Sequence, residues 1–233
     1  MSKSLGIITI NHKRPQVLAL WCAQIKRLRS ELGCAIPAVV VSEEEDKTIC
    51  SRYQVAHITQ ENKPVTAKFN RAFWFMRDVG VDYVTILGSD DIISTQFGRD
   101  TKVLMETGID LIGVWSFYFY CGHGVDRGKL VRLERANSRT FLGIGRTVSK
   151  RVLDQCDWTL WDVEKNWAMD AIASKNLAKY AVTKAKVEGM IVDVKTNDNL
   201  NSFRIWSKRL PEVNPQEFYD ILSEEELEIL KSL

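Results

Sequence analysis

The stretch DYVTILGSDDII (residues 82–93) decides the fold, because a short apolar run ends at two adjacent carboxylates, Asp90 and Asp91, and apolar residues resume behind them. The apolar run is rich in β-branched residues, which predicts a buried strand. Neighbouring carboxylates repel each other, and near apolar surroundings they are costly unless they are paired or hold a metal. The pair therefore indicates either a helix cap or a cation site. A cap needs one carboxylate, so the second favours the cation site.

Similar apolar runs recur along the chain, and amphipathic segments separate them. We expect strands at residues 5–10, 37–42, 55–59, 82–87, 110–120 and 189–196, and helices at residues 15–33, 64–79, 94–107, 149–156, 166–180 and from residue 215. The strands are continuously apolar, which is typical of a parallel sheet covered by helices on both faces. The first half is therefore predicted to be a doubly wound α/β unit. Residues 122–145 are rich in glycine and arginine and predict loops with a hairpin.

Polar residues collect where the predicted strands end, and ligands of open parallel sheets bind beyond these ends. The ends carry Asn11, His12, Lys13 and Arg14 after the first strand, Ser42, Glu43, Glu44, Glu45 and Asp46 after the second, and Ser89, Asp90 and Asp91 after the fourth. Cations suit phosphate oxygens, and carboxylates suit ribose hydroxyls or a metal. This edge therefore fits a nucleotide with a diphosphate, although solvated turns would also explain Lys13, Arg14 and the acidic run.

Length and composition describe one ordinary globular domain. The chain has 233 residues, of which 45% are hydrophobic and 27% charged, and its net charge of +2 neither requires nor excludes an anionic partner. The 5 cysteines lack the spacing of a disulfide framework or zinc site, which is typical of reduced thiols. No apolar run suits a signal peptide or a transmembrane segment. We therefore expect a cytoplasmic protein.

The order of these motifs resembles the nucleotide-sugar glycosyltransferases of the GT-A fold, and most of all their inverting family 2 group. The likeness runs from Leu5 to Asp170 and rests on Asn11, Arg14-Pro15, the acids after the second strand, Lys68-Phe69-Asn70-Arg71-Ala72 and Gly88-Ser89-Asp90-Asp91. It implies a GT-A, Rossmann-like three-layer sandwich with a mostly parallel central sheet. Within a single domain over residues 1–233, we expect a nucleotide-sugar-binding half (1–120), an acceptor-side half (121–210) and a C-terminal acidic helix (211–233).

The resemblance implies transfer of a sugar from a nucleoside-diphosphate sugar, with UDP as the expected nucleotide, to an acceptor hydroxyl with inversion. The residues implied to bind the nucleotide sugar are Thr9, Asn11, Arg14, Glu43, Glu44, Lys68 and Asp90, with Lys195 and Asn199 from a late loop that closes over the diphosphate. Asp90 and Asp91 would hold Mn²⁺ or Mg²⁺, which neutralises charge on the leaving diphosphate. The family commonly has an Asp-x-Asp motif at this place, and this chain has Gly88 where the first Asp of the motif would stand.

Inverting transfer also needs a base that takes the proton of the acceptor hydroxyl. The family places an acid at the start of a helix after the loop region, and Asp170 lies in register for this role. Met169 stands where the family commonly has Glu. Asp162 and Glu164 are rivals for the role, and an ordinary exposed helix acid is the alternative for Asp170.

The acceptor side of the chain is basic, and the tail is acidic. Between residues 126 and 151 the basic residues are Arg127, Lys129, Arg132, Arg135, Arg139, Arg146, Lys150 and Arg151. They predict either a solvated face or an anionic acceptor, which would be a lipid-linked phosphate, an acidic glycan or a nucleic acid. The tail is predicted to be one helix with acids on its exposed side, namely Glu217, Asp220, Glu224, Glu225, Glu226 and Glu228.

Two other functional classes also fit carboxylates at strand ends. The first is a metal-dependent phosphoryl or nucleotidyl transferase. Phosphatases with an aspartyl nucleophile place their acids after the first strand, where this chain has Asn11-His12, and a sugar nucleotidyltransferase needs a glycine-rich loop that is absent here. The second is a non-catalytic nucleotide- or glycan-binding module, in which Asp170 would be dispensable.

Overall fold

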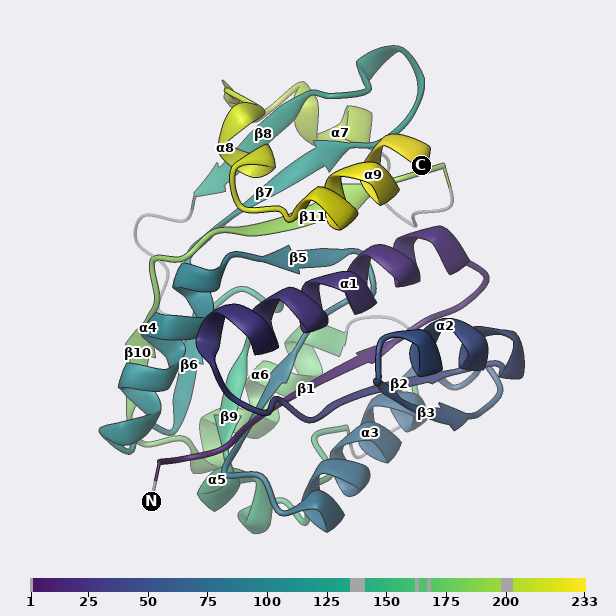
Figure 1. The fold of residues 1–233 in the computed structure, drawn as a ribbon. Helices are drawn as coiled ribbons and strands as arrows, with labels where there is room; N and C mark the ends of the chain where they lie inside the picture. The colour runs from purple at the N-terminus through teal and green to yellow at the C-terminus, as the bar shows by residue number, and fades with distance from the viewer. Residues whose placement is uncertain (1, 135–140, 162–163, 167–168, 198–202) are drawn as a thin grey trace.

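A seven-stranded sheet lies at the centre of the molecule in this computed structural model, which describes residues 2–134, 141–161, 164–166, 169–197 and 203–233 (Figure 1). In order across the sheet, the strands are β10 (Lys184–Lys186), β6 (Leu111–Gly113), β9 (Thr147–Ser149), β4 (Tyr83–Ile86), β1 (Leu5–Ile10), β2 (Ala38–Ser42) and β3 (Ala56–Thr59). Neighbours are parallel except at β9, which runs antiparallel to β4 and β6. The predicted α/β class and mostly parallel central sheet are confirmed.

Helices cover both faces of this sheet. Successive side chains of a strand point to opposite faces, so each buried strand supplies apolar side chains to the helices on both sides. Ile7 packs with the helices of one face and Ile8 with those of the other. The first face is covered by α1 (Pro15–Leu32), α2 (Lys47–Arg52) and α4 (Thr95–Glu106), and the second by α3 (Val65–Val79), α5 (Lys150–Gln155) and α6 (Met169–Tyr180). Among the described residues, no helix has the length and apolar character needed to cross a membrane.

A second sheet packs on the outer side of α1 (Figure 1). Its strands, in order, are β12 (Glu212–Val213), β8 (Leu130–Glu134), β7 (Ser116–Cys121), β11 (Ile191–Lys195) and β5 (Asp91–Ile93). Leu20 of α1 packs against Ile92 and Val194 of this sheet, while Leu18 and Trp21 of the same helix face the central sheet. One long helix is therefore enclosed between two sheets.

The strand expected over residues 110–120 is wrong as a single element. Its first part is β6 of the central sheet, and its second part is β7 of the second sheet. Val114 and Trp115 lie between them; Val114 is buried, and its carbonyl oxygen accepts a hydrogen bond from Leu142 N at 3.1 Å, outside either sheet. An unbroken apolar run does not reveal such a crossing, because both strands and their connection are buried. The expected hairpin is present as the antiparallel pair β7 and β8.

The acid pair does not cap α4. Ser94 is the N-cap, and its Oγ accepts a hydrogen bond from Phe97 N at 3.1 Å. Asp91 is instead the first residue of β5. The helix-cap interpretation of the two carboxylates is therefore excluded.

The acidic tail forms two helices, α8 (Gln216–Tyr219) and α9 (Glu224–Ser232), instead of one. Ser223 interrupts the tail because it caps α9 in a capping box with Glu226. Glu226 is fully buried, contrary to the expectation that the acids of the tail are exposed. Its carboxylate accepts a hydrogen bond from Arg27 Nε at 2.7 Å, which joins α9 to α1.

Candidate active site

Three carboxylates meet where β5 and β11 pair. Asp91 of β5 lies opposite Asp193 of β11 in the antiparallel register, and Asp90 precedes Asp91. Oxygen atoms of the three groups lie within 4.8 Å of one another. The sequence-based prediction included Asp90 and Asp91 and missed Asp193. The available signal was an acid inside an otherwise apolar strand, Ile191-Val192-Asp193-Val194.

Burial and mutual repulsion disfavour the charged forms of Asp91 and Asp193. Burial raises the pKa of Asp91 well above its usual range, and the charges of Asp90 and Asp193 raise it further. Burial, followed by the charge of Asp90, raises the pKa of Asp193 to about 7. The Oδ1 atom of Asp193 is buried and has no hydrogen-bond partner among the described residues. Clustered carboxylates with an unpaired buried oxygen fit a divalent cation, so this triad could hold one.

Two cationic side chains flank the triad. Arg14, at the start of α1, donates from Nη1 to Asp90 Oδ2 and from Nη2 to Ser89 Oγ, both at 2.8 Å. Lys195 Nζ lies 2.6 Å from Asp193 Oδ2. Arg14 and Lys195, two predicted nucleotide-sugar ligands, therefore lie on the acids that the fold brings together. A diphosphate bound here would meet positive charge on both sides of the triad.

Gly88 has no room for a side chain in this arrangement. A Cβ atom there would lie 2.7 Å from Asp90 Oδ1 and 3.0 Å from Asp91 Oδ2. The Gly88 amide also donates a hydrogen bond to Asp91 Oδ2. The first acid of the usual motif is thus replaced by backbone, and Asp193 supplies the third carboxylate from another strand.

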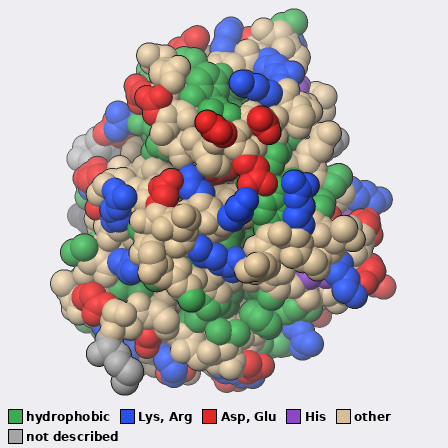
Figure 2. Space-filling model, in the orientation of Figure 1, with side chains coloured by type: hydrophobic (Ala, Val, Ile, Leu, Met, Phe, Trp, Pro, Cys, Tyr) green, Lys and Arg blue, Asp and Glu red, His purple; other side chains and the backbone are tan. Residues whose placement is uncertain are grey.

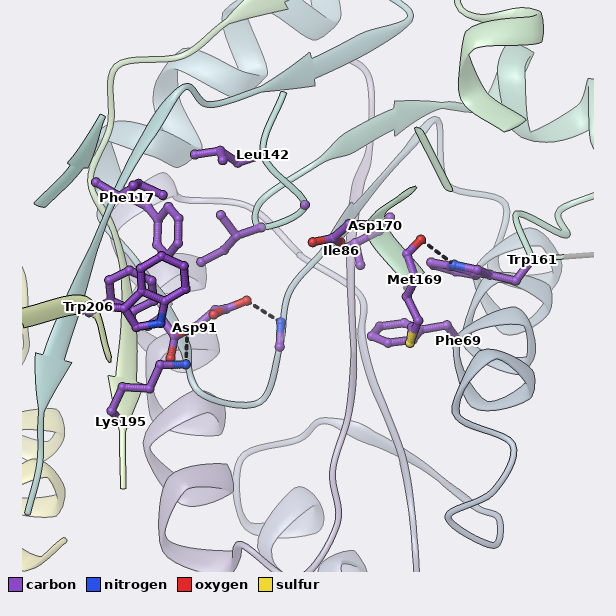
Figure 3. A pocket seen from close by; sticks show the side chains of 16 residues that line it. Phe69, Ile86, Asp91, Phe117, Leu142, Trp161, Met169, Asp170, Lys195 and Trp206 are labelled. Atoms are coloured by element: carbon purple, nitrogen blue, oxygen red, sulfur yellow. Dashed lines mark hydrogen bonds and ion pairs between the residues drawn. The ribbon is translucent and has the colours of Figure 1, made fainter. Parts of the chain in front are cut away.

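A cavity of about 370 Å³ connects the triad to Asp170 (Figure 3). Asp91 and Lys195 lie on the side of Phe117 and Trp206, and Asp170 lies on the side of Trp161 and Met169. The Trp206 indole stacks on Phe119 with ring centroids 4.9 Å apart. The cavity therefore has carboxylates at two places and aromatic side chains on both sides, a surface suited to sugar rings.

Asp170 stands in the first turn of α6, and Arg146 anchors that turn. The Arg146 guanidinium is buried and donates to Leu142 O at 3.0 Å, Ser174 Oγ at 2.7 Å and Asp170 O at 3.3 Å. Burial lowers the pKa of Arg146, and the charge of Asp170 opposes this shift. Arg146 thereby fixes the loop that contains Gly143 against the backbone of Asp170.

Of the rivals for the role of base, the structure describes Glu164. Glu164 is exposed and lines a different cavity, together with Trp74 and Thr159. Asp162 and the predicted ligand Asn199 lie outside the described residues. Of the two candidate bases that the structure describes, Asp170 is the one that lines a cavity with Asp91 and Asp193.

The predicted nucleotide residues near β1 and β2 form a hydrogen-bonded network. Asn11 Nδ2 donates to Asp46 Oδ2 at 2.8 Å, and Lys68 Nζ donates to Asn11 O at 2.6 Å. Asp46, which is buried, is thus the acid nearest this network, although the prediction named Glu43 and Glu44. Glu43 pairs with His12 and Glu44 pairs with Lys47. Thr9 is buried within β1.

Lys68 gives the site a pH dependence that can be measured. Burial lowers the pKa of Lys68 from 10.5 to about 8, partly opposed by the charges of Glu43 and Asp46. From about pH 8 to 10.5 the unfolded chain therefore binds a proton that the folded chain lacks, so the free energy of unfolding rises with pH in this window. The variant Lys68→Met lacks this increment. We expect the difference in urea-unfolding free energy, wild type minus variant, to increase across the window and to be flat below it; a difference independent of pH would contradict the assignment.

The basic residues of the acceptor side each have their own contacts where the structure describes them. Arg135 and Arg139 lie outside the described residues, Arg146 is buried, and the others take part in separate contacts: Arg127 with Lys231 O, Lys129 with Asp126, Arg132 with Glu134, Lys150 with Asp154 and Arg151 with Asp110. On the face shown in Figure 2, Lys and Arg side chains are interspersed with Asp and Glu. Each basic residue of this stretch that the structure describes is thus engaged in a contact, and the anionic acceptor stays a prediction.

Comparisons with known proteins place the fold. No protein-family model matches the chain, and no curated protein matches it. The crystal structure of S. aureus TarS 1–349 resembles it with a TM-score of 0.60 at 16% identity, over 82% of this chain and 60% of that chain. The complex of TarS 1–349 with UDP gives a TM-score of 0.59 at 15% identity, over 97% of this chain and 69% of that one.

A mycobacterial protein of solved structure gives a TM-score of 0.55 at 10% identity, over 85% of this chain and 69% of that chain. This chain spans 38% of the longer TarS structure. These likenesses, together with the sheet described above, confirm the GT-A fold expected from the sequence.

Proposed function

We propose that the chain is a glycosyltransferase that moves a hexose from a UDP-sugar to an acceptor hydroxyl with inversion. The observation that carries the proposal is the cavity that Asp170 lines together with Asp91 and Asp193, two acids of the triad. Such a cavity fits a leaving diphosphate at one end and a base at the other. The TarS structure in complex with UDP supports the choice of nucleotide.

Asp90, Asp91 and Asp193 would hold Mn²⁺ or Mg²⁺, both of which take carboxylate oxygens. When bound, the cation neutralises the charge that develops on the departing diphosphate. Arg14 and Lys195 add positive charge beside the same oxygens. Because their donors are fixed by contacts to Asp90 and Asp193, little reorganisation accompanies the reaction.

Asp170 would take the proton of the acceptor hydroxyl. Inversion requires the acceptor to attack from the side opposite the leaving group, and Asp170 lies across the cavity from Asp91 and Lys195 (Figure 3). The aromatic wall of Phe117, Phe119 and Trp206 would hold the sugar ring between these two ends. In this proposal residues 1–120 supply most nucleotide contacts, while residues 121–210 supply the base and complete the triad. The reaction would take place in the cytoplasm.

Gly143 offers a test of the position of Asp170. A Cβ atom at Gly143 would collide with the Asp170 carboxylate, which is the free end of a side chain and can move. We expect Gly143→Ala to displace the base without lowering the melting temperature, and a misplacement of about 1 Å costs roughly 10²-fold in rate. Initial rates and melting curves check this. Gly98→Ala, whose Cβ would meet only the Leu32 side chain of α1, is the control and should transfer at the wild-type rate.

The proposed activity is tested by incubating the full chain with Mn²⁺ and a panel of UDP-hexoses, with and without hydroxyl acceptors, and following the products by ³¹P NMR. Release of UDP that depends on Asp170 supports glycosyl transfer. Formation of UMP or of a sugar phosphate would instead indicate phosphoryl or nucleotidyl transfer. Binding without any product would indicate a binding module.

A further inference from the structure

The strand that carries Asp91, β5, is hydrogen-bonded along both of its edges, but only one edge pairs with another strand. On one edge, Asp90 O accepts from Val194 N at 2.8 Å and Ser94 N donates to Met190 O at 2.9 Å, so these residues face β11 and its N-terminal flank. Alternate residues of a strand present their backbone groups to opposite edges. The groups of Asp91 and Ile93 therefore face the other way, toward α1.

Gln24 of α1 meets these groups with both ends of its carboxamide. Its Nε2 donates to Asp91 O at 2.7 Å, and its Oε1 accepts from Ile93 N at 2.9 Å. The side chain is fully buried among apolar neighbours of α1 such as Trp21 and Ile25. A buried amide is costly unless its donor and acceptor are both satisfied, and here each is satisfied by β5. Gln24 thus acts as a one-residue substitute for a neighbouring strand.

One turn later on α1, Arg27 extends the same edge. Its Nη2 donates to Ile93 O at 2.8 Å and its Nη1 to Thr95 Oγ1 at 2.9 Å, while Nε is held by the buried Glu226. Arg27 thus fixes the end of β5 that leads into α4. Gln24 contacts the backbone of Asp91 itself.

We propose that Gln24 is a positioning residue for the cation site, a role that rests on the proposed function. The carboxylate of Asp91 can join those of Asp90 and Asp193 only while β5 keeps its register with β11. β5 has three residues, so a ladder on one side gives it few restraints. The carboxamide of Gln24 supplies the missing restraint at Asp91, and an apolar side chain of similar size supplies none.

The test measures Mn²⁺ affinity by calorimetry on the full chain, with and without UDP. In Gln24→Met we expect the Kd for Mn²⁺ to rise by about 10- to 100-fold, as for other residues that orient metal ligands. Leu28→Ala is the matched control, because it removes a buried side chain from the same helix and lowers stability without removing a hydrogen bond to β5. The Kd of Leu28→Ala for Mn²⁺ should stay at the wild-type value.

Amide hydrogen exchange at Ile93 should speed up in Gln24→Met beyond the change seen in Leu28→Ala. Should Gln24→Met fail to fold, Gln24→Ala, which removes both the donor to Asp91 O and the acceptor for Ile93 N, carries the same test.

The possible failures are distinguishable. Wild-type affinity in the Gln24 variant, with loss of affinity in Asp91→Asn, would overturn the positioning role and leave the proposed function intact. Equal weakening in Gln24→Met and Leu28→Ala variants of equal stability would reduce Gln24 to a packing residue. Absence of Mn²⁺ binding in the wild-type chain would overturn the cation site and the positioning role together.

Discussion

Replacing Asp170 with asparagine is expected to reduce sugar transfer by about 10²- to 10⁴-fold, the usual contribution of a general base. Asparagine preserves the shape of the side chain but cannot take the acceptor proton. The triad and its flanking cations lie across the cavity, so the affinity for a UDP-sugar should not change. Single-turnover transfer rates and UDP-sugar binding, measured on the same preparation, separate the two effects.

Glu164→Gln is the matched control for this experiment. Glu164 is an exposed acid in a neighbouring cavity, so its loss should leave the rate unchanged. Normal turnover in Asp170→Asn would show that another acid serves as base. A lost rate in Glu164→Gln would identify that acid.

A second large effect is expected outside the lining of the cavity, at the ion pair that joins α9 to α1. Both Arg27 and Glu226 are buried, and their contact is 2.7 Å long. Glu226→Ala leaves the Arg27 charge buried without its carboxylate, and breaking such pairs costs about 3–5 kcal/mol. It also removes one half of the capping box with Ser223. Urea unfolding of the wild type and the variant measures this loss.

The neighbouring residue provides the comparison. Glu225 pairs with Lys26 on the surface, where the lysine side chain is 65% exposed. Exposed pairs contribute at most about 1 kcal/mol, so Glu225→Ala should have a small effect. Equal losses in the two variants would contradict the buried role of Glu226.

The sequence predicted β1, β2, β3 and β4 of the central sheet, because these strands are short, apolar and separated by amphipathic helices, whereas β9 and β10 were not predicted. Leu5–Ile10 is both the predicted first strand and the observed β1. The second sheet was not predicted, since the run through Val114 is apolar on both sides of the crossing and periodicity does not mark it. Glu226 was placed on the surface because a single acid in an acidic tail gives no sign of a buried arginine partner.

The sequence also predicted only part of the candidate site, because local patterns do not show how distant strands pair. Asp90, Asp91 and Arg14 follow strands that are adjacent in a parallel sheet, so strand order alone brings them together. Asp193 arrives from β11, about a hundred residues later, through pairing with a three-residue strand that no local pattern reveals. Its presence explains why Gly88 is compatible with a cation site: the third carboxylate comes from another strand. The role of Gln24 depends equally on this pairing.

The central claim is that the triad holds a divalent cation beneath a UDP-sugar, and the most direct measurement is calorimetric titration of UDP into the full chain with and without Mn²⁺. We predict UDP binding that depends on Mn²⁺ in the wild type and loses this dependence in Asp193→Asn. Because Asp193 was identified from the fold and not from the motif, its loss tests the assembled site. Binding of UDP with the same affinity with and without Mn²⁺, or no binding at all, would contradict the account.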